Sequence, residues 1–224
     1  MNVEAIDMDL FMKGRFNLYS ELSTLFSSVL TYERVEVLRN LLMLYYATFG
    51  EKEKIIAEET VTKMNTWIDV NYGKKDDADF QLEMAREHTK HFVLGVNKVP
   101  DSASSVLSVK NLIKREQWEN CRKYYRKHGF SLPEGTGKLE DSLEIQCLFI
   151  CTMIQKRSSS EISDESLIIQ SDFIRDHMLN WLDSFGKKLL KMSAAGSIYN
   201  ALAMLPYILI KADMECLSGL LRLE

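Results

Sequence analysis

The pattern of apolar positions is densest between Lys138 and Gln155, where Cys147 to Ile154 are nearly all apolar and the whole stretch contains no Pro or Gly. A helix with apolar side chains on almost every side must be wrapped by other helices. We therefore predict a buried central helix over about 138–156. Its start is polar, and the unpaired amides and dipole of a helix N-terminus favour a polar site there.

Three-four spacing of apolar residues predicts further helices along most of the chain. They cover about 9–28, 32–49, 52–72, 79–94, 106–113, 115–128, 171–190 and 194–221. Pro206 predicts a kink or break in the last of them. Segments 95–105 and 157–166 have the composition of loops, and the breaker-rich link 131–138 is a possible hinge. Since no strand alternation and no internal repeat occur, the prediction is an all-α protein with a single helical domain over 1–224.

Composition and charge argue against several classes of protein. The 224 residues are 46% hydrophobic and 27% charged, which is ordinary for a globular protein. A net charge of -4 argues against general nucleic-acid binding, and basic pairs such as Lys114-Arg115 fit solvated surfaces. No apolar run reaches the roughly 18 residues that a membrane span needs. The first ten residues carry three acids and no Lys or Arg, so we expect no signal peptide and a soluble, cytoplasmic protein.

The sequence offers little catalytic chemistry. His88 and His91 are three residues apart on a predicted helix, a spacing that fits two metal ligands as well as a plain polar face. A small metal- or nucleotide-dependent enzyme using them is the alternative function. No phosphate-binding loop or Glu-x-x-His pair is present. Asp141 and Glu144 match a capping box, in which Asp141 accepts from the Glu144 amide. We therefore predict no catalytic residue, no metal and no cofactor.

Several short motifs, in this order over some 190 residues, resemble the TorD/DmsD family of chaperones for molybdenum-containing redox enzymes. They are Arg15…Tyr19…Leu22…Leu25-Phe26, Glu87 to Phe92, Pro100 with Ser105-Val106, Tyr125…Gly129-Phe130, Leu139 to Phe149, and Phe173…His177…Trp181…Phe185 with Ile198-Tyr199…Ala201-Leu202. In the stretch that opens the central helix, Asp141 matches the family's Asp, whereas Ser142 stands where the family carries a His.

The resemblance implies an all-helical cytoplasmic chaperone. It implies binding of the twin-arginine leader on a partner reductase's catalytic subunit, and retention of that subunit until its molybdopterin cofactor is loaded. Domain-swapped dimers occur in such families, so the working form is expected to be a monomer or a domain-swapped homodimer hinged at 131–138. Because Ser142 cannot carry the charge of a His, we expect a divergent client.

A leader with two arginines and an apolar segment needs an acidic mouth beside an apolar groove. We predict that Asp141, Ser142 and Glu144 form the mouth, together with Pro100 and Ser105 of the 95–105 loop. The groove is predicted to use Phe92 and Trp67.

Overall fold

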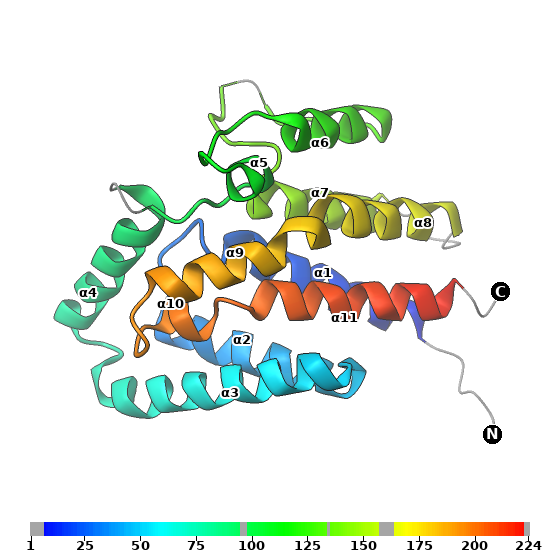
Figure 1. The fold of residues 1–224 in the computed structure, drawn as a ribbon. Coiled ribbons are helices and arrows are strands. Elements are labelled where there is room, and N and C mark those ends of the chain that lie inside the picture. Colours follow the sequence, from blue (N-terminus) through cyan, green and yellow to red (C-terminus); the bar gives the residue numbers. More distant parts are fainter. Residues whose placement is uncertain (1–6, 95–97, 134, 157–163, 222–224) are drawn as a thin grey trace.

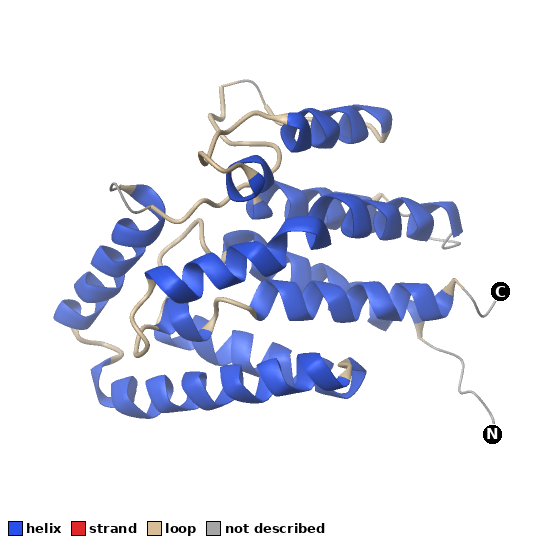
Figure 2. Cartoon of the chain, viewed as in Figure 1, coloured by secondary structure: helices blue, strands red, loops and turns tan. Residues whose placement is uncertain are grey.

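All regular secondary structure in the part of the chain that the structure describes is helical, as predicted (Figure 2). The structure is a computed structural model and describes residues 7–94, 98–133, 135–156 and 164–221. The α-helices are α1 (Met8–Thr24), α2 (Tyr32–Tyr45), α3 (Glu51–Asn71), α4 (Ala78–His88), α5 (Ala103–Leu107), α6 (Glu116–Lys127), α7 (Leu143–Gln155), α8 (Asp164–Phe173), α9 (Leu179–Met192), α10 (Ile198–Ala201) and α11 (Leu205–Leu220). Short 3-10 turns η1 (Tyr46–Thr48) and η2 (Tyr72–Lys74) follow α2 and α3. Single π-helical turns η3 (Thr89–Val93) and η4 (Ile174–Met178) follow α4 and α8.

The helices lie in layers around one continuous cluster of buried apolar side chains. Helix α1 packs along α7, α2 packs on α3, and α11 touches α2, α3, α8 and α9. In Figure 1, α3 forms one edge of the molecule, α6 forms the opposite edge, and α4 stands at the flank. Among the described residues, no helix is both long and apolar enough to cross a membrane.

Helix α7 is the buried rod that the sequence predicts, although it is shorter at its start. Nine of its 13 residues are buried, while Leu148 faces solvent. The helix begins at Leu143, not Lys138, because Ser142 is the N-cap: its hydroxyl accepts from the Ile145 amide at 3.4 Å. The preceding backbone is extended and pairs with another segment in an isolated antiparallel bridge between Ser102 and Ser142.

Other boundaries depart from the predicted ones. Pro206 lies in the first turn of α11 and separates it from α10, which confirms the predicted break, because a proline ring fits where no amide partner is required. The short helix expected at 106–113 is α5, which starts earlier, inside the predicted 95–105 loop. Of the serine-rich loop expected at 157–166, residues 157–163 lie outside the described part, and α8 begins at Asp164.

A fully buried ion pair joins the first and last helices. Arg15 on α1 makes two bonds to Asp213 on α11, Nε to Oδ1 at 2.7 Å and a terminal nitrogen to Oδ2 at 2.9 Å. Tyr19 donates to the same carboxylate at 2.7 Å, and Gln170 accepts from Arg15 at 2.6 Å. Neither charged side chain is exposed. A buried pair is tolerated when its remaining donors and acceptors are satisfied in this way.

The link at 131–138 contains no helix in its described residues. Gly135 and Gly137 take positive φ angles of 80° and 66°, a region that suits glycine. Residue 134 lies outside the described part. The hinge and the domain-swapped dimer stay predictions.

Candidate functional site

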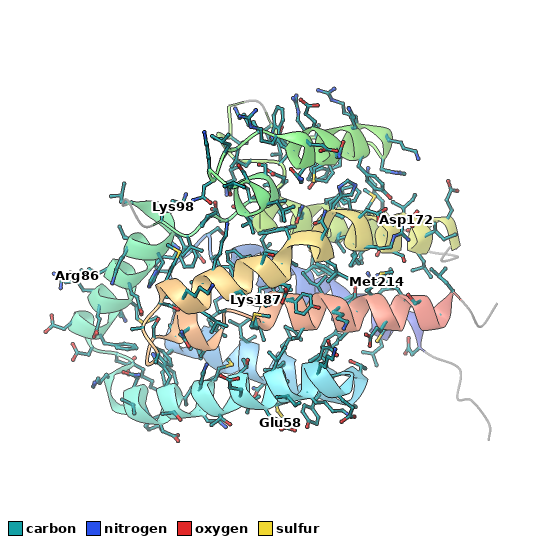
Figure 3. The ribbon with its side chains drawn as sticks, viewed as in Figure 1. Glu58, Arg86, Lys98, Asp172, Lys187 and Met214 are labelled. Atoms are coloured by element: carbon teal, nitrogen blue, oxygen red, sulfur yellow. The ribbon has the colours of Figure 1, made fainter. Side chains whose placement is uncertain are left out.

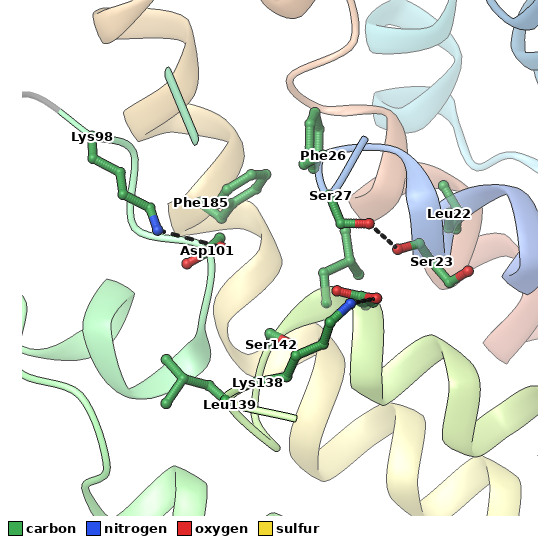
Figure 4. Close-up of a pocket in the computed structure, with 13 residues that line it drawn as sticks. Leu22, Ser23, Phe26, Ser27, Lys98, Asp101, Lys138, Leu139, Ser142 and Phe185 are labelled. Atoms are coloured by element: carbon green, nitrogen blue, oxygen red, sulfur yellow. Dashed lines mark hydrogen bonds and ion pairs between the residues drawn. The ribbon is translucent and has the colours of Figure 1, made fainter. Parts of the chain in front are cut away.

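A cleft of about 260 Å³ opens beside the start of α7 (Figure 4). It gathers residues from the end of α1, the segment before α5, the link before α7, the first turn of α7, and α9. They are Leu22, Ser23, Phe26, Ser27, Lys98, Asp101, Gly137, Lys138, Leu139, Ser142, Leu143, Glu144 and Phe185. Of the residues predicted to form a polar mouth at this helix start, Ser142 and Glu144 line the cleft; their role in binding stays a prediction.

Two carboxylates stand at this cleft, and each faces a lysine of the same chain. Lys138 pairs with Glu144, and Lys98 Nζ lies 4.0 Å from Asp101 Oδ2. Figure 4 shows Lys98 beside Asp101, and Figure 3 shows Lys98 on the connection between α4 and α5. The lysine side chains are 43% and 47% exposed. Solvated pairs of this kind contribute about 0–1 kcal/mol, so an incoming cation can replace either lysine at little cost.

The electrostatics favour such a replacement. Burial raises the pKa of Asp101, the negative charge of Glu144 raises it further, and Lys98 lowers it. Glu144 is thus near enough to Asp101 for its negative charge to act on the Asp101 carboxyl group. A second positive charge bound between Asp101 and Glu144 would relieve that repulsion.

The apolar side of the cleft belongs to an aromatic stack. Phe26, which lines the cleft, packs on Phe92 with ring centroids 5.1 Å apart and on Phe185 at 5.2 Å. Phe92 is itself 5% exposed. Phe26 and Phe185 line the cleft, whereas Phe92 does not line it and packs behind the Phe26 ring.

Asp141 is not at the open mouth where the sequence analysis expected it. Its side chain is 0% exposed. One carboxylate oxygen accepts from the Ser104 amide at 2.7 Å, and the Asp141 carbonyl accepts from the Ala103 amide at 2.9 Å. The predicted capping box is wrong by one residue, because Ser142 caps α7 while Asp141 holds the start of α5. Burial raises the pKa of Asp141, and its second oxygen Oδ1 has no partner among the described residues.

The remaining predicted site residues do not line this cleft. Ser105 is buried and donates to the Ser102 carbonyl at 2.9 Å. Pro100 directly precedes Asp101 and is partly exposed. Trp67 packs on Phe80 with centroids 5.8 Å apart.

Trp67 belongs to a second cavity, of about 530 Å³. This cavity lies between α3, α4 and the turn before α10; Trp67, Glu83, Glu87, Lys90 and Ser197 are among its lining residues. The sequence analysis joined Trp67 and Phe92 in one groove, and the structure separates them.

The histidines expected in the alternative enzyme are buried rather than assembled into a metal site. His88 Nε2 lies 3.1 Å from the Phe26 carbonyl oxygen, and His91 packs edge-on against Tyr199. No group of three or more His, Cys, Asp or Glu side chains that could hold a metal occurs in the described ranges. The pair Cys121 and His177, with Sγ and Nδ1 3.8 Å apart, is no activated nucleophile either, since burial raises the pKa of Cys121 to about 12.

The sequence analysis does not name Asp101, Phe26 or Phe185 as site residues, yet all three line the cleft. Asp101 is the single acid of the 95–105 loop that the sequence places at the mouth. The available signal was the position of Asp101 directly after Pro100, in a loop expected to lie near the start of α7.

Comparison with known proteins gives several relatives. The chain is 28% identical over 151 residues to the protein named "Chaperone protein TorD" from Vibrio cholerae, covering 66% of this chain and 68% of that one. The protein of the same name from Vibrio vulnificus is 25% identical over 213 residues, covering 93% and 97%. That from Shewanella piezotolerans is 22% identical over 219 residues, covering 92% and 94%. No solved structure matches the chain.

The family model described as "Nitrate reductase delta subunit" matches residues 55–186. This match spans α4 to α8 with parts of α3 and α9, and it includes Asp101, Ser142 and Glu144 of the cleft. The all-helical fold, the relatives that cover nearly the whole chain and this family model agree. The chain belongs to the nitrate reductase delta subunit and TorD chaperone family.

Proposed function

We propose that this protein is a chaperone for the maturation of a molybdenum-containing oxidoreductase. It binds the twin-arginine leader of the catalytic subunit and holds that subunit in the cytoplasm until its molybdopterin cofactor has been inserted. The relatives named as TorD chaperones and the sequence resemblance support the chaperone role. The observation that carries the leader-binding part is the cleft with Asp101 and Glu144 beside the Phe26 and Phe185 rings.

The chemistry of the cleft matches the two parts of such a leader. Two guanidinium groups can each take a carboxylate in two-pronged hydrogen bonds, which the point charges of Lys98 and Lys138 cannot equal. The apolar residues that follow the arginines can lie on Phe26 and Phe185. The volume of about 260 Å³ is below the roughly 300–1,000 Å³ of whole small-molecule pockets. The cleft therefore accepts one or two side chains, and the rest of the leader lies on the surface around it.

The mechanism is an exchange of partners without covalent chemistry. The exposed lysines leave Asp101 and Glu144 as the arginines arrive, and they return when the leader departs. Because each arginine must displace a lysine, part of the gain from its hydrogen bonds is lost, and we expect modest affinity, roughly micromolar or ~8 kcal/mol. Such an affinity allows release after the cofactor has been loaded.

The test measures binding of a fluorescent twin-arginine leader peptide from a molybdenum reductase of the same organism. Glu144→Gln and Asp101→Asn remove one charge each, and each is expected to weaken binding by roughly 1.5–3 kcal/mol, the usual contribution of a hydrogen bond to a charged group. Glu51→Gln is the matched control, because Glu51 forms a similar exposed pair with Lys54 on α3. Leader binding that survives the double variant unchanged would show that this cleft is not the receptor.

A further inference from the structure

The edge of the molecule formed by α6 and the connection before it differs in charge from the rest of the chain. Residues 107–127, here called the α6 edge, contain seven Lys and Arg and only two Glu, whereas the whole chain has a net charge of -4. The basic residues are Lys110, Lys114, Arg115, Arg122, Lys123, Arg126 and Lys127. Of these, only Arg122 forms an ion pair with a described residue, namely Glu140 at 3.2 Å. The α6 edge is therefore a concentrated and largely unneutralised positive surface.

Apolar side chains protrude from the same edge. Val109 is 102% exposed, Ile113 52%, and Leu107 and Leu112 40% each, all within seven residues. None of these four lines either of the two cavities described above. They form an exposed apolar tip, and Lys110, Lys114 and Arg115 lie among and beside them in the sequence.

The protruding loop is held in place by the body of the protein. Lys188 on α9 donates to the Val106 carbonyl at 2.7 Å and lies 3.4 Å from the Asn111 side-chain oxygen. Asn111 and Lys114 both take left-handed backbone angles, with φ of 51° and 54°. That conformation is uncommon for a lysine. The fold thus holds the loop in a defined, conformationally unfavourable backbone geometry that exposes its apolar side chains.

An aromatic residue marks the boundary between the tip and the body. The partly exposed Trp118 ring lies under the Arg122 guanidinium, 4.4 Å from its carbon, and near Lys114 Nζ at 5.7 Å. Its indole nitrogen donates to Glu140. A tryptophan with a solvated polar edge and an apolar ring face is typical of the headgroup region of a membrane interface.

We propose that the α6 edge binds the surface of a membrane rich in anionic phospholipid. Val109, Leu112 and Ile113 enter the boundary between headgroups and acyl chains, while the cations beside them and along α6 meet the phosphates. A bilayer offers a negatively charged layer directly above an apolar one, which matches an exposed apolar tip with cations beside it. An acidic protein would instead need its own pocket for these side chains. Figures 1 and 3 show that α6 stands at the margin of the molecule, with side chains directed away from it.

The test is flotation of the full chain with phosphatidylcholine vesicles that contain or lack phosphatidylglycerol. We expect binding only to the anionic vesicles, with loss in high salt. Substitution of Lys110, Lys114 and Arg115 by glutamine should weaken vesicle binding by about fivefold per cation. The double variant Val109→Ser with Ile113→Ser should also weaken vesicle binding. The midpoint of thermal unfolding should not change, because both side chains are already exposed. Leu44→Ser with Ile55→Ser is the matched control, since those side chains are 72% and 67% exposed on α2 and α3.

Three outcomes would overturn the proposal. One is absence of binding to anionic vesicles. Another is binding that the α6-edge variants leave unchanged. The third is binding of polyglutamate, but not of vesicles, that the same variants abolish, because this would identify an acidic polypeptide as the partner. None of these outcomes bears on leader binding, since no residue of the α6 edge lines the cleft.

Discussion

The ion pair between α1 and α11 and the ion pairs at the cleft join carboxylates to cations in opposite surroundings. Between α1 and α11, Arg15 and Asp213 are both 0% exposed and share hydrogen bonds with Tyr19 and Gln170. At the cleft, Glu144 pairs with a lysine that is 47% exposed and Asp101 with one that is 43% exposed. The same chemistry therefore locks the fold in one region and offers an exchangeable contact in the other.

The difference lies in what surrounds the charges. Removing one partner of a buried pair leaves an unsolvated charge, so that pair cannot open while the protein stays folded. Forming or breaking a solvated ion pair changes the free energy little, because water and dissolved salt stabilise each separated ion. A binding site built from charges needs the second arrangement, and the cleft beside α7 has it.

The largest expected effect comes from breaking the buried pair. Asp213→Ala leaves the Arg15 guanidinium without its counter-charge and should destabilise the protein by about 3–5 kcal/mol. Urea unfolding followed by circular dichroism measures this loss. A variant that loses less than about 1 kcal/mol would show that water reaches Arg15 and that the contrast with the cleft is false.

Asp141 supplies an intermediate case, a buried carboxylate without a cation. Burial raises its pKa in the folded protein above the ordinary value of 3.8. The folded state thus holds this proton more tightly than the unfolded state, so the contribution of Asp141 to stability is complete below that value and is lost as pH rises through the raised pKa. Asp141→Asn should flatten the decline of stability with rising pH.

The measurement is urea unfolding of both proteins over a series of pH values from about 4 upward. Asp183→Asn serves as the control, because Asp183 forms an exposed pair with Lys187. An unchanged slope for the Asp141 variant would mean that its carboxylate is solvated in solution.

The smallest effect on stability is expected at the cleft itself. Lys138→Gln removes an exposed partner of Glu144 and should change the free energy of unfolding by less than about 1 kcal/mol. The same variant should bind a twin-arginine leader up to about fivefold more tightly, since the arginine no longer has to displace Lys138. Titration of the leader peptide into both proteins measures the change, and weaker binding by the variant would contradict the exchange of partners.

Sequence reasoning found the elements whose signals are local. The apolar run of α7 and the break before α11 follow from Cys147 to Ile154 and from Pro206, with no knowledge of their neighbours. Ser142 and Glu144 were placed correctly at a polar helix start for the same reason. Such features depend on propensity and capping, which act within a few residues.

The side-chain orientations that the sequence does not predict depend on which helices and loops pack together. Nothing local distinguishes Asp141, which accepts from the Ser104 amide, from Asp101, which lines the cleft. Both lie beside the antiparallel bridge between Ser102 and Ser142, a contact between distant segments. Trp67 and Phe92 are both large aromatic residues, yet Trp67 on α3 lines the second cavity and Phe92 on η3 is buried. Tertiary contacts between distant segments set these orientations, and a single sequence does not display them.

The distance along the chain between Arg15 and Asp213, 198 residues, has a consequence for synthesis on the ribosome. The guanidinium of the first helix has no counter-charge until the last helix has emerged. Because Asp213 on α11 is the carboxylate that pairs with Arg15 in the described residues, a growing polypeptide cannot complete its buried core until translation is nearly over. Nascent chains stalled before α11 should therefore be far more sensitive to protease than the released protein.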